Sequence, residues 1–251
     1  MPATPVPSPP VTDAAPIAVI MAAGRGTRMG GDLPKVLFEA AGKPLVRWVL
    51  DALEAAGVTD RIVVVGYRAE LVEATLAGLP GVTFAVQKEQ RGTGDAVAAA
   101  AGQIRERLQR TPPAAHRPVV VVCGDSPMLR PESITGLLDR FAELRAACLL
   151  GTAVTADPRG LGRIVRDATG RFIGIVEEKD ATAREKAIRE VGASIYLFAA
   201  GFLQAGLRRL SNRNAQKEYY LTDLIAQAAR AERRVDVLRW DCPVDLRGVN
   251  D

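Results

Sequence analysis

The chain has 251 residues, of which 48% are hydrophobic and 25% are charged, and its formal net charge is +4. This length and composition are typical of a globular protein that buries a sizeable core. Basic and acidic side chains are interleaved with no long basic block, which argues against a nucleic-acid-binding protein and leaves the positive excess for a pocket that takes an anionic small molecule.

The cysteine and histidine content restricts the chemistry further. Cys123, Cys148 and Cys242 form no CxxC or metal-binding spacing, and three cysteines cannot all pair within one chain. We therefore expect reduced thiols and a cytoplasmic protein. The single histidine, His116, lies in a predicted loop, which argues against a histidine-based catalytic triad or zinc site.

The two ends of the chain differ in composition. The first sixteen residues are rich in proline and alanine and lack the basic and apolar regions of a secretory signal. We expect residues 1–16 to be a disordered tail and residues 17–251 to form one domain. No stretch is long and apolar enough to span a membrane, so we expect no membrane partner.

In the first half of the domain, short apolar runs alternate with amphipathic segments. The runs predict buried strands at 17–22, 61–67, 82–87 and 118–125. The segments between and after them predict helices at 43–58, 69–79, 93–109 and 131–144. Thr93 is a candidate N-cap, and Pro131 suits the first turn of its helix.

The second half has a looser pattern. It predicts a hairpin over 163–178 that turns at DATG, helices at 181–191 and 218–234, and strands at 193–198 and 235–240. Within EYYLTD we expect aromatic packing against the sheet and a capping role for Thr222 or Asp223. Strands that alternate with helices predict an α/β fold, with a Rossmann-like, doubly wound and mostly parallel mixed sheet.

The stretch VIMAAGRGTRMGGDLPKVL, from Val19 to Leu37, places a glycine-rich turn after the first strand. It lacks the P-loop pattern, and it departs from GxGxxG because Met29 stands at the third glycine position. Glycines permit close backbone approach, and free N–H groups bind anions. Arg28 can grip phosphate oxygens in a bidentate fork, and Lys35 adds a mobile charge. The stretch predicts a phosphate-binding turn, with a plain turn carrying solvated basic residues as the alternative.

Two further polar side chains lie at predicted strand ends. Asp125 ends a predicted strand, and the carboxyl ends of parallel strands open onto the ligand crevice. A carboxylate there can hold Mg²⁺, although GDSP is also typical of a turn. Gln87 can donate to and accept from a base edge, with an ordinary strand-end glutamine as the alternative.

Several ordered blocks together resemble the sugar-1-phosphate nucleotidyltransferases, in particular the uridylyltransferase domains that make UDP-N-acetylglucosamine in bacteria. The blocks are AAGRGTRM, DLPKVL, GKPLV, QKEQRGTGDA, GDSPML, GLGRIVRD, GIVEEKDAT, NAQKEYYLTD and GVN. They cover nearly everything after the tail. The resemblance implies a nucleotide-diphospho-sugar transferase fold. It also implies a Mg²⁺-dependent reaction of UTP with a sugar-1-phosphate that gives a UDP-sugar and pyrophosphate.

The resemblance also implies roles for individual residues. Arg28, Lys35 and Asp125 would be catalytic, and Asp125 with Asn250 would hold Mg²⁺. Gln87, Gly92 and Thr93 would contact uracil, whereas Gly162 and Glu177 would contact the sugar. The full set of expected nucleotide- and substrate-binding residues is Met21, Ala22, Ala23, Gly24, Arg25, Gly26, Lys35, Gln87, Gly92, Thr93, Gly124, Gly162, Glu177 and Asn250.

Three positions depart from the family's pattern. Gly192-Ala193-Ser194 stands where the family usually has Asn-Thr-Gly, Asp95 where the bacterial enzyme usually has histidine, and Cys123 where an aromatic residue often stands. The first departure leaves the identity of the sugar open. One alternative is a cytidylyltransferase, or another enzyme of this fold, with a different phosphate acceptor. A non-catalytic nucleotide-sugar binding protein is the other, and the intact set of charged site residues disfavours it. The oligomeric state stays open.

Overall fold

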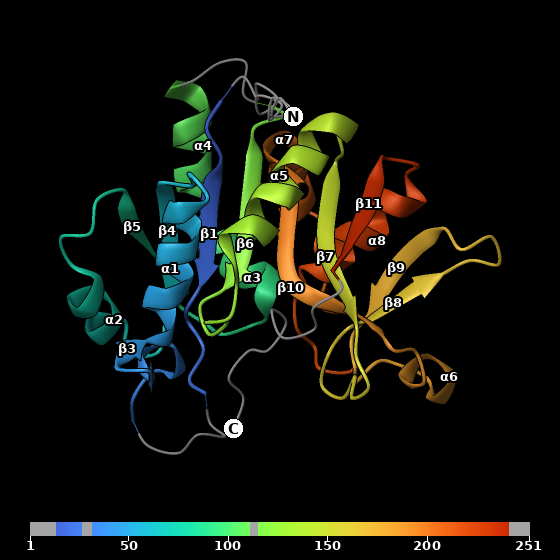
Figure 1. Cartoon of the computed structure of the whole chain (residues 1–251), viewed down its shortest axis with the longest axis horizontal. Helices are drawn as coiled ribbons and strands as arrows, with labels where there is room; N and C mark the ends of the chain where they lie inside the picture. The colour runs from blue at the N-terminus through green and yellow to red at the C-terminus, as the bar shows by residue number, and fades with distance from the viewer. Residues whose placement is uncertain (1–13, 27–31, 111–114, 241–251) are drawn as a thin grey trace, which may run out of the picture.

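A mixed sheet runs through the centre of the molecule, with helices on both faces (Figure 1). The computed structural model describes residues 14–26, 32–110 and 115–240. The strands of the large sheet are β1 (Ile17–Met21), β4 (Asp60–Val65), β5 (Val82–Val86), β6 (Pro118–Cys123), β7 (Cys148–Val154), β8 (Arg163–Arg166), β9 (Phe172–Val176), β10 (Glu190–Ala199) and β11 (Val235–Trp240). A separate ladder joins β2 (Glu39–Ala40) to β3 (Lys43–Pro44).

The strand order is β11-β7-β10-β6-β1-β4-β5, and the β8–β9 hairpin branches from β10. The strands β6, β1, β4 and β5 pair in parallel, β10 runs antiparallel to β6 and β7, and β11 runs parallel to β7. The predicted mostly parallel mixed sheet is confirmed. Met21 at the end of β1 pairs with Cys123 at the end of β6, so both strands finish at the same edge.

Alternating burial along the strands explains the two layers of helices. In β1, Ala18 and Ile20 face one core, whereas Ile17 and Val19 face the other. The helices are α1 (Leu45–Ala55), α2 (Ala69–Leu76), α3 (Thr93–Ala99), α4 (Ala101–Arg110), α5 (Pro131–Leu144), α6 (Ala183–Lys186), α7 (Ala200–Leu207), α8 (Thr222–Arg230) and the 3₁₀ helix η2 (Lys35–Leu37). The first core packs against α1, α2 and α5, and the second against α3, α4, α7 and α8.

Three predicted helices differ from the observed ones. The helix expected at 93–109 is divided at Ala100 into α3 and α4. The helix expected at 181–191 is only the short α6, because the following residues from Glu190 onward pair in β10. The helix expected at 218–234 begins at Thr222, because the residues before it bond to the 91–94 loop instead. Pro131 does lie in the first turn of α5.

Both predicted capping roles are wrong. The N-cap of α3 is Gly92, and the Thr93 hydroxyl accepts a hydrogen bond from the N–H of Leu221. The N-cap of α8 is Leu221, without a side-chain cap, and the Thr222 hydroxyl bonds elsewhere. In both cases a contact between distant segments takes the hydroxyl that local sequence assigns to the helix end.

The sequence pattern missed β2, β3, β7, α7 and η2, but the hairpin of β8 and β9 and the strand β11 lie where they were predicted. His116 lies in the loop before β6, as expected, and stacks on Phe141 with 5.4 Å between ring centroids. None of the helices in the described ranges is long and apolar enough to cross a bilayer.

Candidate functional site

A pocket of about 270 Å³ lies at the edge of the sheet where β1 and β6 end. Its lining includes eight residues that the sequence predicts as site residues: Met21, Ala23, Gly24, Lys35, Gln87, Gly92, Thr93 and Asp125. These residues come from five separate stretches of the chain. A crevice outside the carboxyl ends of parallel strands is the usual ligand site in open α/β sheets, so both the position and the lining favour a binding site.

Other predicted site residues lie next to this pocket without lining it. Ala22 is buried beside the strands, and its N–H donates to the carbonyl of Val64 at 2.8 Å. The N–H of Gly124 donates to the carbonyl of Met21 at 2.9 Å, which joins β6 to β1 at the pocket floor. Arg25 stacks on Tyr67, with 5.1 Å from its guanidinium carbon to the ring centroid. Two predicted residues, Arg28 and Asn250, lie outside the described residues.

Gly26 is required for the turn that follows β1. Its φ is +67°, a region that side chains rarely adopt, and a Cβ there would lie 2.5 Å from the Cβ of Lys35. The absence of a side chain therefore lets the turn close against η2, in which Lys35 is the first residue. The turn and the short helix together fix where the Lys35 stem begins.

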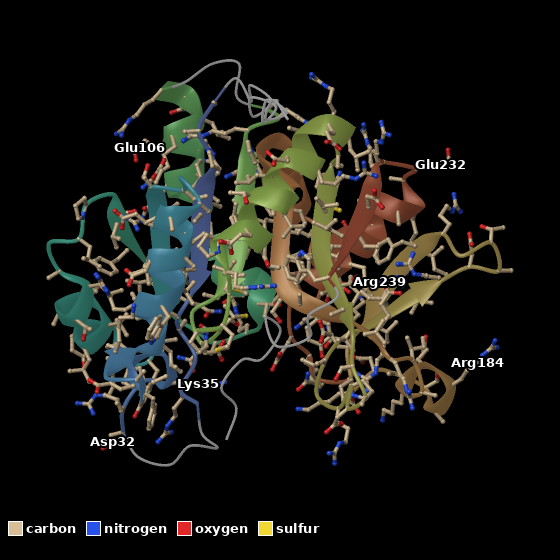
Figure 2. All side chains as sticks on the ribbon, viewed as in Figure 1. Asp32, Lys35, Glu106, Arg184, Glu232 and Arg239 are labelled. Atoms are coloured by element: carbon tan, nitrogen blue, oxygen red, sulfur yellow. The ribbon has the colours of Figure 1, made fainter. Side chains whose placement is uncertain are left out.

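Lys35 and Asp125 form the central charged pair of the pocket. The Lys35 Nζ lies 2.5 Å from Asp125 Oδ2, and the two side chains are 15% and 22% exposed. Figure 2 shows Lys35 below β1, on the side where that strand ends. Partial burial strengthens such a pair because less water screens it. The arrangement puts one cation and one carboxylate where a phosphate group and a metal ion would each find an opposite charge.

Gln87 is held tightly at the opposite wall of the pocket. Its side chain is 5% exposed, and its amide nitrogen donates to Asp95 Oδ2 at 2.8 Å and to the carbonyl of Gly92 at 3.2 Å. Asp95 also pairs with Arg91 at 2.9 Å. Because an amide nitrogen has two protons, both donors of Gln87 are used within the protein. A bond from Gln87 to a base would therefore use the amide oxygen as an acceptor.

Gly162 and Glu177 lie together at a second side of the site. A Cβ at Gly162 would lie 3.6 Å from Glu177 Oε2, and Thr222 Oγ1 donates to Glu177 Oε1 at 2.9 Å. Burial raises the pKa of Glu177, and the hydrogen bond from Thr222 opposes that rise. Neither Gly162 nor Glu177 lines the pocket; the charge of Glu177 raises the pKa of Cys123, which does line it.

The departure at Gly192-Ala193-Ser194 adjoins the same region. The N–H of Gly192 donates to the carbonyl of Gly162 at 3.0 Å. Ser194 has a φ of +54° and hydrogen-bonds to the Cys123 thiol, whose pKa burial raises to about 12. Cys123 is therefore a neutral thiol at physiological pH and not an activated nucleophile.

Five pocket residues were not predicted as site residues: Val36, Gln90, Ala96, Cys123 and Glu218. The sequence marks Cys123 only as a departure from the family's pattern, and Glu218 only as the first residue of the EYYLTD packing motif. Cys123 could have been predicted as a pocket residue because it lies two residues before Asp125. No local signal marks Glu218, because only the fold brings the 214–221 segment to the pocket.

The described residues offer few side chains that could bind a metal ion. Within the described ranges, no cluster of three or more His, Cys, Asp or Glu side chains could hold a metal. Mg²⁺ is commonly bound through one or two carboxylates together with substrate phosphates and water. The single carboxylate of Asp125 in the pocket fits that mode of binding, and does not fit an all-protein metal cage.

Comparison with protein families and sequences gives a consistent result. A family model described as a MobA-like NTP transferase domain matches residues 18–195. The bifunctional protein GlmU of Geobacter metallireducens is 43% identical over 234 residues, which are 93% of this chain and 48% of that protein. GlmU of Sorangium cellulosum is 47% identical over 242 residues, 93% of this chain and 49% of that protein. The chain thus spans about half the length of the curated relatives it matches.

Solved structures share the fold at low sequence identity. A protein of Bacillus anthracis, described as a glucose-1-phosphate thymidylyltransferase in complex with sucrose, superposes with a TM-score of 0.72 at 18% identity, over 90% of this chain and 87% of that one. A UDP-glucose pyrophosphorylase complexed with UDP-glucose superposes with a TM-score of 0.73 at 15% identity, over 91% of each chain.

Proposed function

Because the chain belongs to the MobA-like NTP transferase family, and within it to the sugar-1-phosphate nucleotidyltransferases, we propose that it transfers a uridylyl group from UTP to N-acetylglucosamine-1-phosphate. The products are UDP-N-acetylglucosamine and pyrophosphate. The observation that carries the proposal is the pocket that combines Gly24, the Lys35–Asp125 pair and Gln87 at the carboxyl edge of the sheet.

The reaction needs little acid–base chemistry from the protein. A phosphate oxygen of the sugar phosphate attacks the α-phosphorus of UTP in line, and pyrophosphate leaves. The attacking phosphate is already largely ionised at neutral pH, because its second pKa is about 6. No general base or covalent nucleophile is required, in keeping with the neutral thiol of Cys123 in the pocket. Catalysis then depends on positioning and on charge stabilisation.

Each proposed contact has a defined task. Lys35 and Arg28 bind phosphate oxygens and stabilise the charge that develops as pyrophosphate leaves. Asp125 and Asn250 hold Mg²⁺, which when bound neutralises phosphate charge as a Lewis acid. Gln87, Gly92 and Thr93 contact the uracil, and Gly162 and Glu177 contact the sugar.

Ser194 gives a specific reason to test other acceptors. It stands in the segment that departs from the family's pattern, and its side chain meets Cys123 beside Asp125. A different side chain at this place alters the groups that meet the sugar. The second candidate function is therefore nucleotide transfer to a different phosphate acceptor by the same site.

A matrix of nucleotides against sugar phosphates, read by pyrophosphate release with Mg²⁺, tests the proposal. We expect the highest kcat/KM with UTP and N-acetylglucosamine-1-phosphate. Preference for another sugar phosphate would favour the second candidate. A folded protein that releases pyrophosphate with none of the pairs would overturn both.

A further inference from the structure

One short segment touches both sides of the site. On the nucleotide side, the N–H of Tyr219 donates to the carbonyl of Arg91, and the N–H of Gly94 donates to the carbonyl of Tyr219, both at 2.7 Å. The N–H of Leu221 donates to Thr93 Oγ1 at 3.0 Å. The segment Tyr219–Thr222 is thus bonded to the loop that carries the proposed uracil contacts.

On the sugar side, the same segment ends at Thr222, which bonds to Glu177. Thr222 is the first residue of α8 and is 3% exposed. A threonine at a helix start ordinarily caps backbone N–H groups, but this hydroxyl donates to Glu177 Oε1 at 2.9 Å. Because the Thr222 hydroxyl is buried and Glu177 is only partly exposed, this bond restricts the orientation of the Glu177 carboxylate.

Glu177 needs such a partner because its other surroundings oppose its charge. Burial raises its pKa, and the neighbouring carboxylates of Asp180, Asp223 and Glu218 raise it further. The hydrogen bond from Thr222 acts in the opposite direction. Without that bond, the carboxyl group gains a proton at higher pH and loses its fixed orientation.

We propose that Thr222 is a positioning residue that holds the Glu177 carboxylate for the sugar phosphate, and that the segment Tyr219–Thr222 joins this carboxylate to the uracil-contacting loop. This inference rests on the proposed function, since it requires Glu177 to meet the sugar. It adds a residue that contacts no substrate itself and acts through its neighbour.

The variant Thr222→Val tests the positioning role, because valine keeps the shape of the side chain and removes the donor. We expect the KM for N-acetylglucosamine-1-phosphate to rise about tenfold, as for the loss of one hydrogen bond to a charged group, while the KM for UTP stays within about twofold. Thr222→Ser retains the hydroxyl and should restore the wild-type KM.

The pH profile supplies a readout that a purely structural role would not move. In Thr222→Val the bond that lowers the pKa of Glu177 is gone, so the fall in activity on the acidic side should occur at higher pH. A ¹³C NMR titration of the Glu177 carboxyl group should show the same upward shift without turnover. This measurement keeps the inference testable even if the wild-type protein fails to make a UDP-sugar, a result that would count against the proposed function alone.

Thr152→Val is the matched control. Thr152 is also a buried threonine, and it donates at 3.1 Å to Glu190 Oε1, a carboxylate that pairs with Arg166 and is not among the proposed site residues, although Thr152 itself pairs with Gly192 across β7 and β10. We expect its two KM values to stay near those of the wild type. An unchanged sugar-phosphate KM in Thr222→Val, equal effects in both threonine variants, or a parallel rise in both KM values would overturn the inference. If melting curves show that Thr222→Val is unfolded, Thr222→Ala provides the same comparison.

Discussion

Gly24 and Gly26 lie two residues apart in the turn after β1, yet a side chain would meet different surroundings at each. A Cβ at Gly26 would lie 2.5 Å from the Cβ of Lys35, on a backbone with a φ of +67°. A Cβ at Gly24 would have no atom within 4 Å, and the φ there is outside the left-handed region. Alanine at each position therefore separates a structural requirement from a requirement for close approach of a ligand.

Gly26→Ala should destabilise the folded protein. The left-handed backbone costs an alanine about 1–2 kcal/mol, and relief of the contact with Lys35 costs about 1–3 kcal/mol more. The sum is about 2–5 kcal/mol, which for a domain of this size lowers the melting temperature by about 4–20 °C. Differential scanning calorimetry measures this change directly.

Gly24→Ala should leave the free protein as stable as the wild type, within about 0.5 kcal/mol, because the new methyl group meets nothing. It should nevertheless weaken UTP binding about tenfold, since the methyl group takes the space through which a phosphate reaches the backbone N–H groups. Isothermal titration of UTP with Mg²⁺ measures the affinity. A stable Gly24→Ala protein that binds UTP as tightly as the wild type would refute the phosphate-binding role of this turn.

Three further substitutions test other parts of the site. Asp125→Asn should lower kcat about 10²–10³-fold, measured as initial rates over a range of Mg²⁺ concentrations. Gln87→Leu removes the amide oxygen that would accept a hydrogen bond from the uracil N3–H, a donor that cytosine lacks, and should reduce the preference for UTP over CTP, measured with both nucleotides in competition. Glu178→Gln weakens the 2.5 Å ion pair with Arg163, which is 1% exposed, and should cost about 2–3 kcal/mol of unfolding free energy at pH 7. Arg163 lowers the pKa of Glu178, so the stabilisation is present above the unfolded pKa of about 4.3, and urea titrations should show the difference shrinking as the pH falls below about 4.

The parallel part of the sheet could be predicted because its strands are continuous apolar runs. Buried on both faces, β4 and β6 each contain four consecutive β-branched residues, Ile62–Val65 and Val119–Val122, a composition that the local sequence reveals. By contrast, β7 lies between β10 and β11, and its antiparallel pairing runs from Val154 with Glu190 to Cys148 with Phe198, between residues far apart in the chain. The local sequence pattern missed β7 because its place in the sheet depends on this long-range pairing, which that pattern does not contain.

Much of the candidate site could also be predicted, for a related reason. Gly24 and Asp125 lie at the ends of predicted parallel strands, and such ends meet at one edge of the sheet; Lys35 follows in the same motif as Gly24. Glu218 also lines the pocket, but it precedes a helix and belongs to a run of polar and aromatic residues. Its position follows from the hydrogen bonds of the next residue, Tyr219, to the 91–94 loop, which sequence spacing does not specify.

The threonines at the helix starts show why some side-chain contacts around the site could not be predicted from the sequence. Thr93 and Thr222 each match the local preference for a cap, and a cap would satisfy one N–H group of its own helix. In the folded protein Thr93 accepts from Leu221, and Thr222 donates to Glu177, so both hydroxyls serve partners far away in the chain. The backbone groups at a helix start are N–H donors and offer the Thr222 proton no acceptor, whereas the Glu177 carboxylate accepts it. That acceptor reaches Thr222 only once α8 has packed against β9, so the local sequence does not reveal it.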